Sequence, residues 1–310
     1  MTKSNNKINF LIDFDSKTGA GHLIRSGTLG NYLKKKKFKV KYYLLKKYKK
    51  ILPFSNISNF QIANYDKIFD IVKDEPVIID SYYIDKSLEK KIFKNNKKTI
   101  IIDDKNTRKR YGSIIISPYP FKKKIKPSFK SQKILQGKKY LIIPEFIKNL
   151  KRKPNSIKNA IMINFGYNSD HIIKFFLKHY TFKKDFNYYL LANKKVENNK
   201  NVFFFNKNKY LYYLSRVNLV YGSPGLSEIE RIYLKIPSIL FATSQDQIKN
   251  GVYYKKIYNN FFGKLTKKNI NKISKKKLLE AIIADNKSKS LIDDKCLQRI
   301  YTHIKKIINE

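Results

Sequence analysis

The chain of 310 residues has one cysteine and no tryptophan. Because Cys296 has no partner in the chain, an internal disulfide is excluded, and a reducing compartment is favoured. No apolar run approaches the roughly 18 residues that a membrane-spanning helix needs. The polar stretch 1–9 also lacks the pattern of a signal peptide. We therefore expect a soluble cytoplasmic protein without a membrane span.

Acidic residues are scarce too, 23 against 67 lysines and arginines, which leaves a net charge of +44. Such a charge suggests a nucleic acid or an anionic membrane as partner. The excess is nearly all lysine, however, and it accompanies abundant Asn, Ile, Tyr and Phe, the residues that A+T-rich codons favour. We therefore expect solvated lysines and no nucleic-acid partner, with a residual field that attracts an anionic substrate such as a nucleotide sugar. A polyanion-binding protein is the rival hypothesis.

Short apolar runs alternate with amphipathic stretches, a pattern typical of parallel strands joined by helices. The pattern occurs twice, which predicts an α/β protein with two facing Rossmann-like domains, 1–150 and 156–290, and a cleft between them. A polar stretch at 147–155 is the predicted linker, and 291–310 is a predicted C-terminal helix. The predicted strands are Ile8–Phe14, Val40–Leu45, Val77–Asp80, Thr99–Asp103, Ser113–Ser117, Ala160–Phe165, Phe186–Leu191, Val202–Phe205, Val217–Tyr221 and Ser238–Phe241. The predicted helices are Gly21–Lys36, His171–Tyr180, Lys207–Ser215, Ser227–Lys235 and Gln247–Tyr258, followed by two lysine-rich helices between Lys275 and Glu310.

A glycine-containing turn follows the first predicted strand and opens a helix. Gly19 and Gly21 let the backbone approach a ligand, and His22, one of four histidines, follows them. In α/β proteins ligands bind where strands end and helices begin, and the ordinary pKa of histidine suits proton transfer near neutrality. This turn is a candidate substrate site. The alternative is that His22 only lines or caps the first helical turn.

A second strand also ends in a turn with two glycines, Gly222 and Gly225. Ser227 is placed to cap the next helix, and free amides together with the helix dipole suit a diphosphate. One turn further, Glu230 can accept hydrogen bonds from ribose hydroxyls. Gln247 begins the following predicted helix, within reach of a sugar or phosphate. The pattern predicts a nucleotide site, with ordinary capping as the alternative for Ser227.

These motifs resemble a known family. The sequence is similar to the hydrolase of UDP-2,4-diacetamido-2,4,6-trideoxy-β-L-altropyranose in pseudaminic acid biosynthesis. The similarity lies in the motif Gly-x-Gly-His-x-x-Arg over 19–25 and in the second glycine turn, which is followed by Glu230, Pro237 and Gln247. The family is related to spore-coat polysaccharide proteins and, more distantly, to the lipid II GlcNAc transferase. The resemblance implies the GT-B architecture, a UDP-sugar substrate, and hydrolysis at the anomeric carbon. Weaker matches lie at 78–82, 101–104, 136–146 and 164–170.

The resemblance also implies roles for single residues. His22 would activate water for attack on the anomeric carbon, UDP would leave, and the configuration would invert. Tyr82 matches a family tyrosine near the sugar and would orient the water or His22, with core packing as the alternative. Because UDP is a good leaving group, we expect no cofactor and no metal. The other histidines also show no metal-ligand spacing.

Three charged residues near these motifs have two interpretations each. Asp13 and Asp80 end predicted strands, so they bind substrate or cap turns. Arg25, one turn beyond His22, faces the predicted cleft or a surface carboxylate. A glycosyltransferase is the main rival function, with His22 deprotonating an acceptor hydroxyl instead of water. The sequence leaves the exact sugar and the oligomeric state open.

Overall fold

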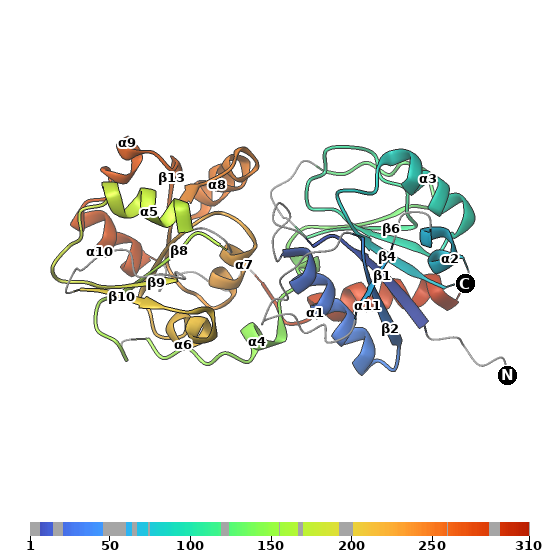
Figure 1. The fold of residues 1–310 in the computed structure, drawn as a ribbon, viewed down its shortest axis with the longest axis horizontal. Helices are drawn as coiled ribbons and strands as arrows, with labels where there is room; N and C mark the ends of the chain where they lie inside the picture. Colours follow the sequence, from blue (N-terminus) through green and yellow to red (C-terminus); the bar gives the residue numbers. More distant parts are fainter. Residues whose placement is uncertain are drawn as a thin grey trace. The chain divides into compact units, whose positions relative to one another are not determined.

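The computed structural model describes residues 7–14, 21–45, 60–63, 67–73, 75–118, 124–154, 156–166, 170–191, 201–258, 260–284 and 292–309. The chain divides into two compact units (Figure 1). Unit 1 comprises residues 1–144 and 292–310, and unit 2 comprises residues 145–291. Each unit has one parallel sheet and several helices, so the predicted α/β class is confirmed. Within the described residues, no helix combines the length and the apolar character needed to cross a membrane.

Unit 1 has a seven-stranded sheet in the order β3-β2-β1-β4-β5-β6-β7, and all its strand pairs are parallel. Its elements are β1 (Lys7–Ile12), α1 (Gly21–Lys35), β2 (Lys39–Leu44), β3 (Gln61–Ile62), α2 (Ile68–Val72), β4 (Val77–Asp80), α3 (Lys86–Asn95), β5 (Thr99–Ile102), β6 (Ile114–Ser117), β7 (Lys133–Gln136), the 3-10 helix η2 (Lys138–Tyr140) and α11 (Cys296–Asn309). The central strands β4 and β5 are buried throughout. That burial explains their unbroken runs of Val, Ile and Thr, because helices cover both faces of a parallel sheet.

Two pairs of helices cover the two faces of this sheet. Helices α2 and α3 bury Ile68, Val72 and Ile92 in one apolar cluster with side chains from β1, β4 and β5. Helix α1 packs on the other face, so closely that a Cβ on Gly30 would lie 2.1 Å from the Tyr42 hydroxyl oxygen. Glycine at position 30 is therefore a requirement of packing.

The C-terminal helix α11 belongs to unit 1 and lies beside α1 (Figure 1). It buries Leu297, Ile300 and Ile304. Tyr301 meets Tyr32 of α1 edge to face, with ring centroids 6.2 Å apart. Segments from both parts of the sequence are thus needed to cover this face of the unit 1 sheet.

Unit 2 has a six-stranded parallel sheet in the order β10-β9-β8-β11-β12-β13. Its elements are α4 (Glu145–Lys148), β8 (Ala160–Asn164), α5 (Asp170–His179), β9 (Asn187–Leu191), β10 (Val202–Phe205), the 3-10 helix η3 (Lys207–Lys209), α6 (Tyr210–Leu214), β11 (Leu219–Gly222), α7 (Leu226–Tyr233), β12 (Ser238–Ala242), α8 (Gln245–Tyr258), β13 (Phe261–Lys264), α9 (Lys267–Ile270) and α10 (Lys275–Ala284). The predicted helix over 207–215 is a 3-10 turn followed by the short α6.

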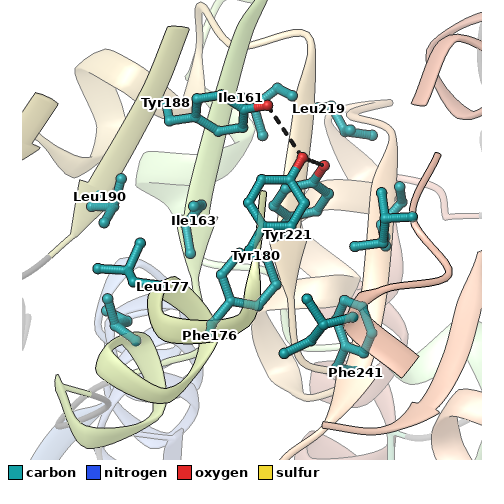
Figure 2. Close-up of a cluster of buried hydrophobic side chains, with 14 of the residues drawn as sticks. Ile161, Ile163, Phe176, Leu177, Tyr180, Tyr188, Leu190, Leu219, Tyr221 and Phe241 are labelled. Atoms are coloured by element: carbon teal, nitrogen blue, oxygen red, sulfur yellow. Dashed lines mark hydrogen bonds between the residues drawn. The ribbon is translucent and has the colours of Figure 1, made fainter. Parts of the chain in front are cut away.

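The core of unit 2 contains a chain of buried tyrosines (Figure 2). The Tyr180 hydroxyl lies 2.7 Å from that of Tyr221 and 3.2 Å from that of Tyr188, and it hydrogen-bonds both. The backbone N–H of Lys183 donates to the Tyr188 hydroxyl over 3.0 Å. Each phenol therefore has a partner, as buried polar groups require.

The stretch 147–155, which was predicted as a linker, lies within unit 2. Arg152 ties it to that unit, because its Nη1 donates to the carbonyl oxygens of Leu214 and Val217 over 3.1 and 2.9 Å. The division between the units falls instead between residues 144 and 145. The polar composition and the proline of this stretch predicted a linker between the domains, but a composition does not reveal the hydrogen bonds that Arg152 donates to backbone carbonyl oxygens.

Candidate functional site

The winding direction of the unit 1 sheet reverses between β1 and β4, which are neighbours. In open α/β sheets, ligands bind beyond the carboxyl ends of strands at such a switch point. Asp13 follows β1, Asp80 ends β4, and Tyr82 comes two residues later. His22 is the second residue of α1, the helix that follows β1. The switch point thus brings four of the predicted site residues together.

His22 has one nitrogen bound and one free. Its side chain is 2% exposed, and its Nδ1 lies 3.1 Å from the carbonyl oxygen of Asp80. A carbonyl oxygen only accepts hydrogen bonds, so Nδ1 carries the proton and Nε2 holds the lone pair. Nε2 is buried and has no hydrogen-bond partner among the described residues. Burial lowers the pKa of His22, an effect that Asp80 opposes and Arg25 reinforces, so the neutral imidazole is favoured.

Arg25 binds buried carboxylates rather than a surface carboxylate, which corrects one predicted alternative. Its Nε donates to Asp80 over 2.8 Å, its Nη2 binds the other oxygen of the same carboxylate, and its Nη1 donates to Asp104 over 2.6 Å. Burial disfavours the charge of Arg25, but the carboxylates of Asp104 and Asp80 outweigh it and raise its pKa. Burial also opposes the ionisation of Asp104, whose pKa is nonetheless lowered by Arg25 and His22. The guanidinium thus joins the carboxyl ends of β4 and β5.

Asp13 holds the turn that follows β4. It accepts a hydrogen bond from the Ser81 hydroxyl over 2.7 Å, and its other oxygen binds the backbone N–H groups of Tyr82 and Tyr83. Burial raises the pKa of Asp13, and these hydrogen bonds counteract that rise. Of the two predicted roles, the described contacts are those of turn capping. Asp80 is likewise occupied, because its carboxylate binds Arg25 and accepts from the Ser26 hydroxyl over 2.8 Å.

Tyr82 contacts His22 directly. The two rings meet edge to face, with centroids 4.3 Å apart and an interplanar angle of 79°. The Tyr82 hydroxyl donates to Asp104 over 2.6 Å, and burial together with this carboxylate raises its pKa. On the ring face, the Lys105 ammonium nitrogen lies 3.7 Å from the ring centroid. The Tyr82 ring therefore packs against His22, while its hydroxyl already binds Asp104.

Two groups of residues complete the description of this site. Gly21 begins α1 and is partly exposed, whereas Gly19 lies outside the described residues. The sequence interpretation gave no role to Asp104 or Ser26, and the adjacent acidic pair after β5 was the available signal for Asp104. Among the described residues, no group of three or more His, Cys, Asp or Glu side chains could hold a metal ion.

In unit 2 the corresponding switch point lies between β8 and β11. Gly222 ends β11, and a Cβ there would lie 2.9 Å from the Nη2 of Arg231. This fully buried arginine binds Glu228 over 2.7 Å and donates to the carbonyl oxygen of Ser223 over 2.9 Å. Gly222 thus makes room for an internal guanidinium. Arg231 therefore stabilises the turn after β11 through its hydrogen bond to the Ser223 carbonyl oxygen.

The helix after this turn begins one residue earlier than predicted. Gly225 is its N-cap and Leu226 its first residue, so Ser227 lies inside the first turn of α7. The capping prediction for Ser227 was wrong, because the N-cap is Gly225, which has no side chain to accept a hydrogen bond. The first N–H groups of α7 therefore donate to no side chain of the cap residue, and that of Glu228 donates to the carbonyl oxygen of Gly225 over 3.1 Å.

Glu230 and Gln247 lie on the two helices that follow. Burial raises the pKa of Glu230 to about 7, and the residue as a whole is half-buried. Its Oε2 lies 3.5 Å from the Tyr210 hydroxyl, at the limit of a hydrogen bond. Gln247 is the third residue of α8, which begins at Gln245, and its Oε1 accepts from the backbone and hydroxyl of Thr243. Its Nε2 would be 3.9 Å from a Cβ on Gly225, so the amide group points to the turn.

No family model and no curated protein matches the sequence. Solved structures do resemble the chain. A co-structure of S. aureus MnaA with UDP is 11% identical with a TM-score of 0.65, over 98% of this chain and 97% of that one. MurG of Acinetobacter baumannii is 10% identical, with a TM-score of 0.62 over 97% and 99% of the chains. Arabidopsis thaliana UGT89C1 with UDP-L-rhamnose is 9% identical, with a TM-score of 0.62 over 99% and 100%.

Identities this low show the fold alone, because function depends on the site. The architecture of two Rossmann-like units with parallel sheets defines an α/β protein of the doubly wound type. More specifically, the chain has a GT-B-like fold.

Proposed function

We propose that this chain is a UDP-sugar hydrolase in which His22 is the general base. The observation that carries the proposal is the buried, unpartnered Nε2 at the switch point, with Nδ1 held by the Asp80 carbonyl. A general base needs a fixed lone pair and a pKa near or below the working pH. His22 meets both conditions, because its Nδ1–H is anchored and burial lowers its pKa.

The reaction follows from this tautomer. His22 Nε2 takes a proton from water as the water oxygen bonds to the anomeric carbon. The bond from that carbon to the diphosphate oxygen breaks, and UDP leaves with the electron pair. The attack comes from the face opposite the leaving group, so the configuration inverts. The imidazolium that forms has the Asp80 carboxylate 3.6 Å from its Nδ1, which stabilises the new charge.

For the nucleotide we assign the turn after β11 and the start of α7. Backbone N–H groups at a helix start suit a diphosphate, and no side chain occupies the cap of α7. Glu230, one turn further, is the acceptor for ribose hydroxyls, and the Gln247 amide near Gly225 is a donor for an oxygen of the nucleotide sugar. UDP-bound MnaA and UDP-L-rhamnose-bound UGT89C1, both of the same fold, support this choice of nucleotide.

The sugar itself is proposed from the sequence motifs. Gly-x-Gly-His-x-x-Arg and the spacing from Glu230 to Gln247 resemble the hydrolase of the diacetamido-trideoxy-altrose nucleotide, so that compound and its stereoisomers are the first substrates to test. We accordingly propose that the protein is a cytoplasmic enzyme in the biosynthesis of pseudaminic acid-like sugars. No metal or cofactor takes part in the proposed step, since UDP leaves without strong acid assistance.

The test is UDP release without an added acceptor. We expect the protein to release UDP from the diacetamido UDP-sugar, His22→Ala to abolish release, and both proteins to bind UDP with similar affinity. His171→Ala is the matched control, because His171 is exposed on α5 of unit 2. If release by His22→Ala equals that of the unsubstituted protein, His22 is not the base.

A glycosyltransferase is the second candidate, with an acceptor hydroxyl in place of water at His22 Nε2. One observation favours it: the Lys105 ammonium lies over the Tyr82 ring, which itself contacts His22, and a cation in this position suits an anionic group of an acceptor. MurG, the kitacinnamycin glycotransferase and spinosyn forosaminyltransferase share the fold. UDP release that occurs only when an acceptor is added would establish this function and exclude the hydrolase.

A further inference from the structure

The loop after β5 places a cation on the ring of Tyr82, which contacts the proposed base. The Lys105 side chain is exposed, and its Nζ lies 3.7 Å from the Tyr82 ring centroid. The same ring touches His22. No carboxylate of the described residues forms an ion pair with Lys105, and the neighbouring Asp104 already binds Arg25 and Tyr82. Lys105 is thus a cation at the site without a counter-ion among the described residues.

Hydrogen bonds to the loop fix the position of the Lys105 backbone. The Oδ1 of Asp103 accepts hydrogen bonds from the backbone N–H groups of Lys105 and Asn106, each over 3.1 Å. Arg110 lies 3.4 Å from the same carboxylate and also binds the buried Glu89 of α3. The backbone of the loop is therefore anchored to the sheet and to α3, and it keeps the ammonium next to Tyr82.

An ammonium over an aromatic ring keeps its hydrogen-bond donors available. The ring attracts the charge through its π face but accepts no strong hydrogen bond. The Tyr82 hydroxyl points to Asp104, so it is not the partner either. An anionic oxygen group is the natural ligand for such a cation, and the unpartnered His22 Nε2 nearby is a second sign that a ligand binds here.

The direction of the reaction decides which part of the substrate this anion belongs to. In an inverting displacement, the nucleophile and the leaving group lie on opposite faces of the sugar ring. The base touches the nucleophile, and Lys105 lies on the ring that packs against the base, so we assign the cation to the nucleophile's side. The diphosphate leaves from the other face. Lys105 therefore meets the acceptor rather than UDP.

We propose that Lys105 binds an anionic group, a phosphate or a carboxylate, of an acceptor whose hydroxyl is deprotonated by His22. The inference rests on the second candidate function, the glycosyltransferase, and on the proposed role of His22 as base. The acceptor O–H proton passes to Nε2, the acceptor oxygen bonds to the anomeric carbon, and UDP leaves with the electrons of the broken bond. The substrate class is a UDP-sugar plus an acidic acceptor.

The test observes His22 directly and needs no turnover. With ¹³C,¹⁵N-labelled histidine, the four histidines of the chain give separate ring signals, and His22→Ala identifies that of His22. Glycerol 3-phosphate and glucuronate are titrated at constant pH and ionic strength, as the phosphate and carboxylate probes. Glycerol and glucose are the neutral counterparts. The proteins compared are the unsubstituted chain, Lys105→Gln, Lys105→Arg and, as matched control, Lys109→Gln, an exposed lysine of the same loop.

We expect at least one anion to shift the His22 signal saturably, while the neutral compounds do not. Lys105→Gln should weaken that binding about tenfold, the loss expected for one charge-assisted contact. Lys105→Arg and Lys109→Gln should retain it. Whichever probe binds more tightly identifies the group as phosphate or carboxylate, and equal binding still identifies an anion site.

Three results would overturn the inference. The first is an unchanged affinity for both anions in Lys105→Gln, and the second is the lack of any saturable shift. The third is that UDP alone loses affinity in Lys105→Gln, since the ammonium would then contact the diphosphate. A failure of His22 as base would appear separately, as UDP release retained in His22→Ala, and it would leave the titration result in place.

Discussion

The three hydrogen-bonded tyrosines of unit 2 (Figure 2) make a quantitative prediction. Tyr180 is the central member, so Tyr180→Phe removes both hydroxyl–hydroxyl bonds at once. Tyr188 keeps the bond from the Lys183 N–H, but the Tyr221 hydroxyl loses its one hydrogen-bond partner among the described residues, and Tyr221 is 0% exposed. The rings still pack, because phenylalanine keeps the contact with Phe176.

The expected cost in free energy of unfolding follows from the number of hydrogen bonds lost. Each lost bond costs about 1 kcal/mol, and the stranded hydroxyl of Tyr221 adds about 1–3 kcal/mol. Tyr180→Phe should therefore cost roughly 3–5 kcal/mol. Tyr221→Phe removes one hydrogen bond, and the Tyr180 hydroxyl keeps its bond to Tyr188, so this substitution should cost about 1 kcal/mol. Adding Tyr221→Phe to Tyr180→Phe removes the stranded hydroxyl, and the second substitution should then stabilise unit 2.

The assay is hydrogen exchange measured by mass spectrometry, which reports each unit separately. Two units make a single global unfolding free energy ill-defined, whereas peptides of β8, β9 and β11 report opening of unit 2. Tyr180→Phe should speed their exchange by about two orders of magnitude or more and leave unit 1 peptides unchanged. The reasoning would be refuted if Tyr180→Phe and Tyr221→Phe had equal costs in free energy and these costs added in the double variant. Additive costs mean that the hydroxyls are not coupled.

Three further predictions concern single contacts. Asp104→Asn removes a negative charge that raises the pKa of His22, so the acid limb of the kcat/KM profile should move to lower pH, and a shift to higher pH would contradict the assignment of His22 as base. Burial raises the pKa of Glu230 to about 7. The protein should therefore bind UDP more tightly at one pH unit above that value, where the carboxylate is ionised, than at one pH unit below it. Calorimetry should show that Glu230→Gln loses this pH dependence of UDP affinity. The buried Tyr42 hydroxyl has no hydrogen-bond partner among the described residues, so Tyr42→Phe should stabilise unit 1 by about 1 kcal/mol, and no gain in its exchange protection would count against that explanation.

The sequence predicted the central strands well, because parallel strands buried on both faces carry continuous apolar runs. The central strand Val77–Asp80 has the bounds that the pattern predicted. The edge strand β7 escaped notice, since only Leu135 is buried in its four residues. Helix α3 was also missed, because it is rich in lysine and buries only Glu89 and Ile92.

For the candidate site, the sequence indicated the residues but not their partners. His22 and Tyr82 are far apart in the chain, and they meet only because β1 and β4 are neighbours in the sheet. Arg25 illustrates the limit: its partners Asp80 and Asp104 come from two further strand ends, and a sequence pattern does not contain the strand order that joins them. Ser227 was misassigned for a local reason, since Gly225 already serves as the cap.

The position of α11 in unit 1 has a consequence for the order of synthesis on the ribosome. Residues 292–310 complete a unit whose other part ends at residue 144, and unit 2 is encoded in between. At ordinary translation rates the first segment waits on the order of ten seconds for its final helix. Unit 2 is continuous in sequence and can fold before unit 1 is complete. During this interval the surface of unit 1 that later meets Leu297, Ile300 and Ile304 is open to chaperones and to other nascent chains.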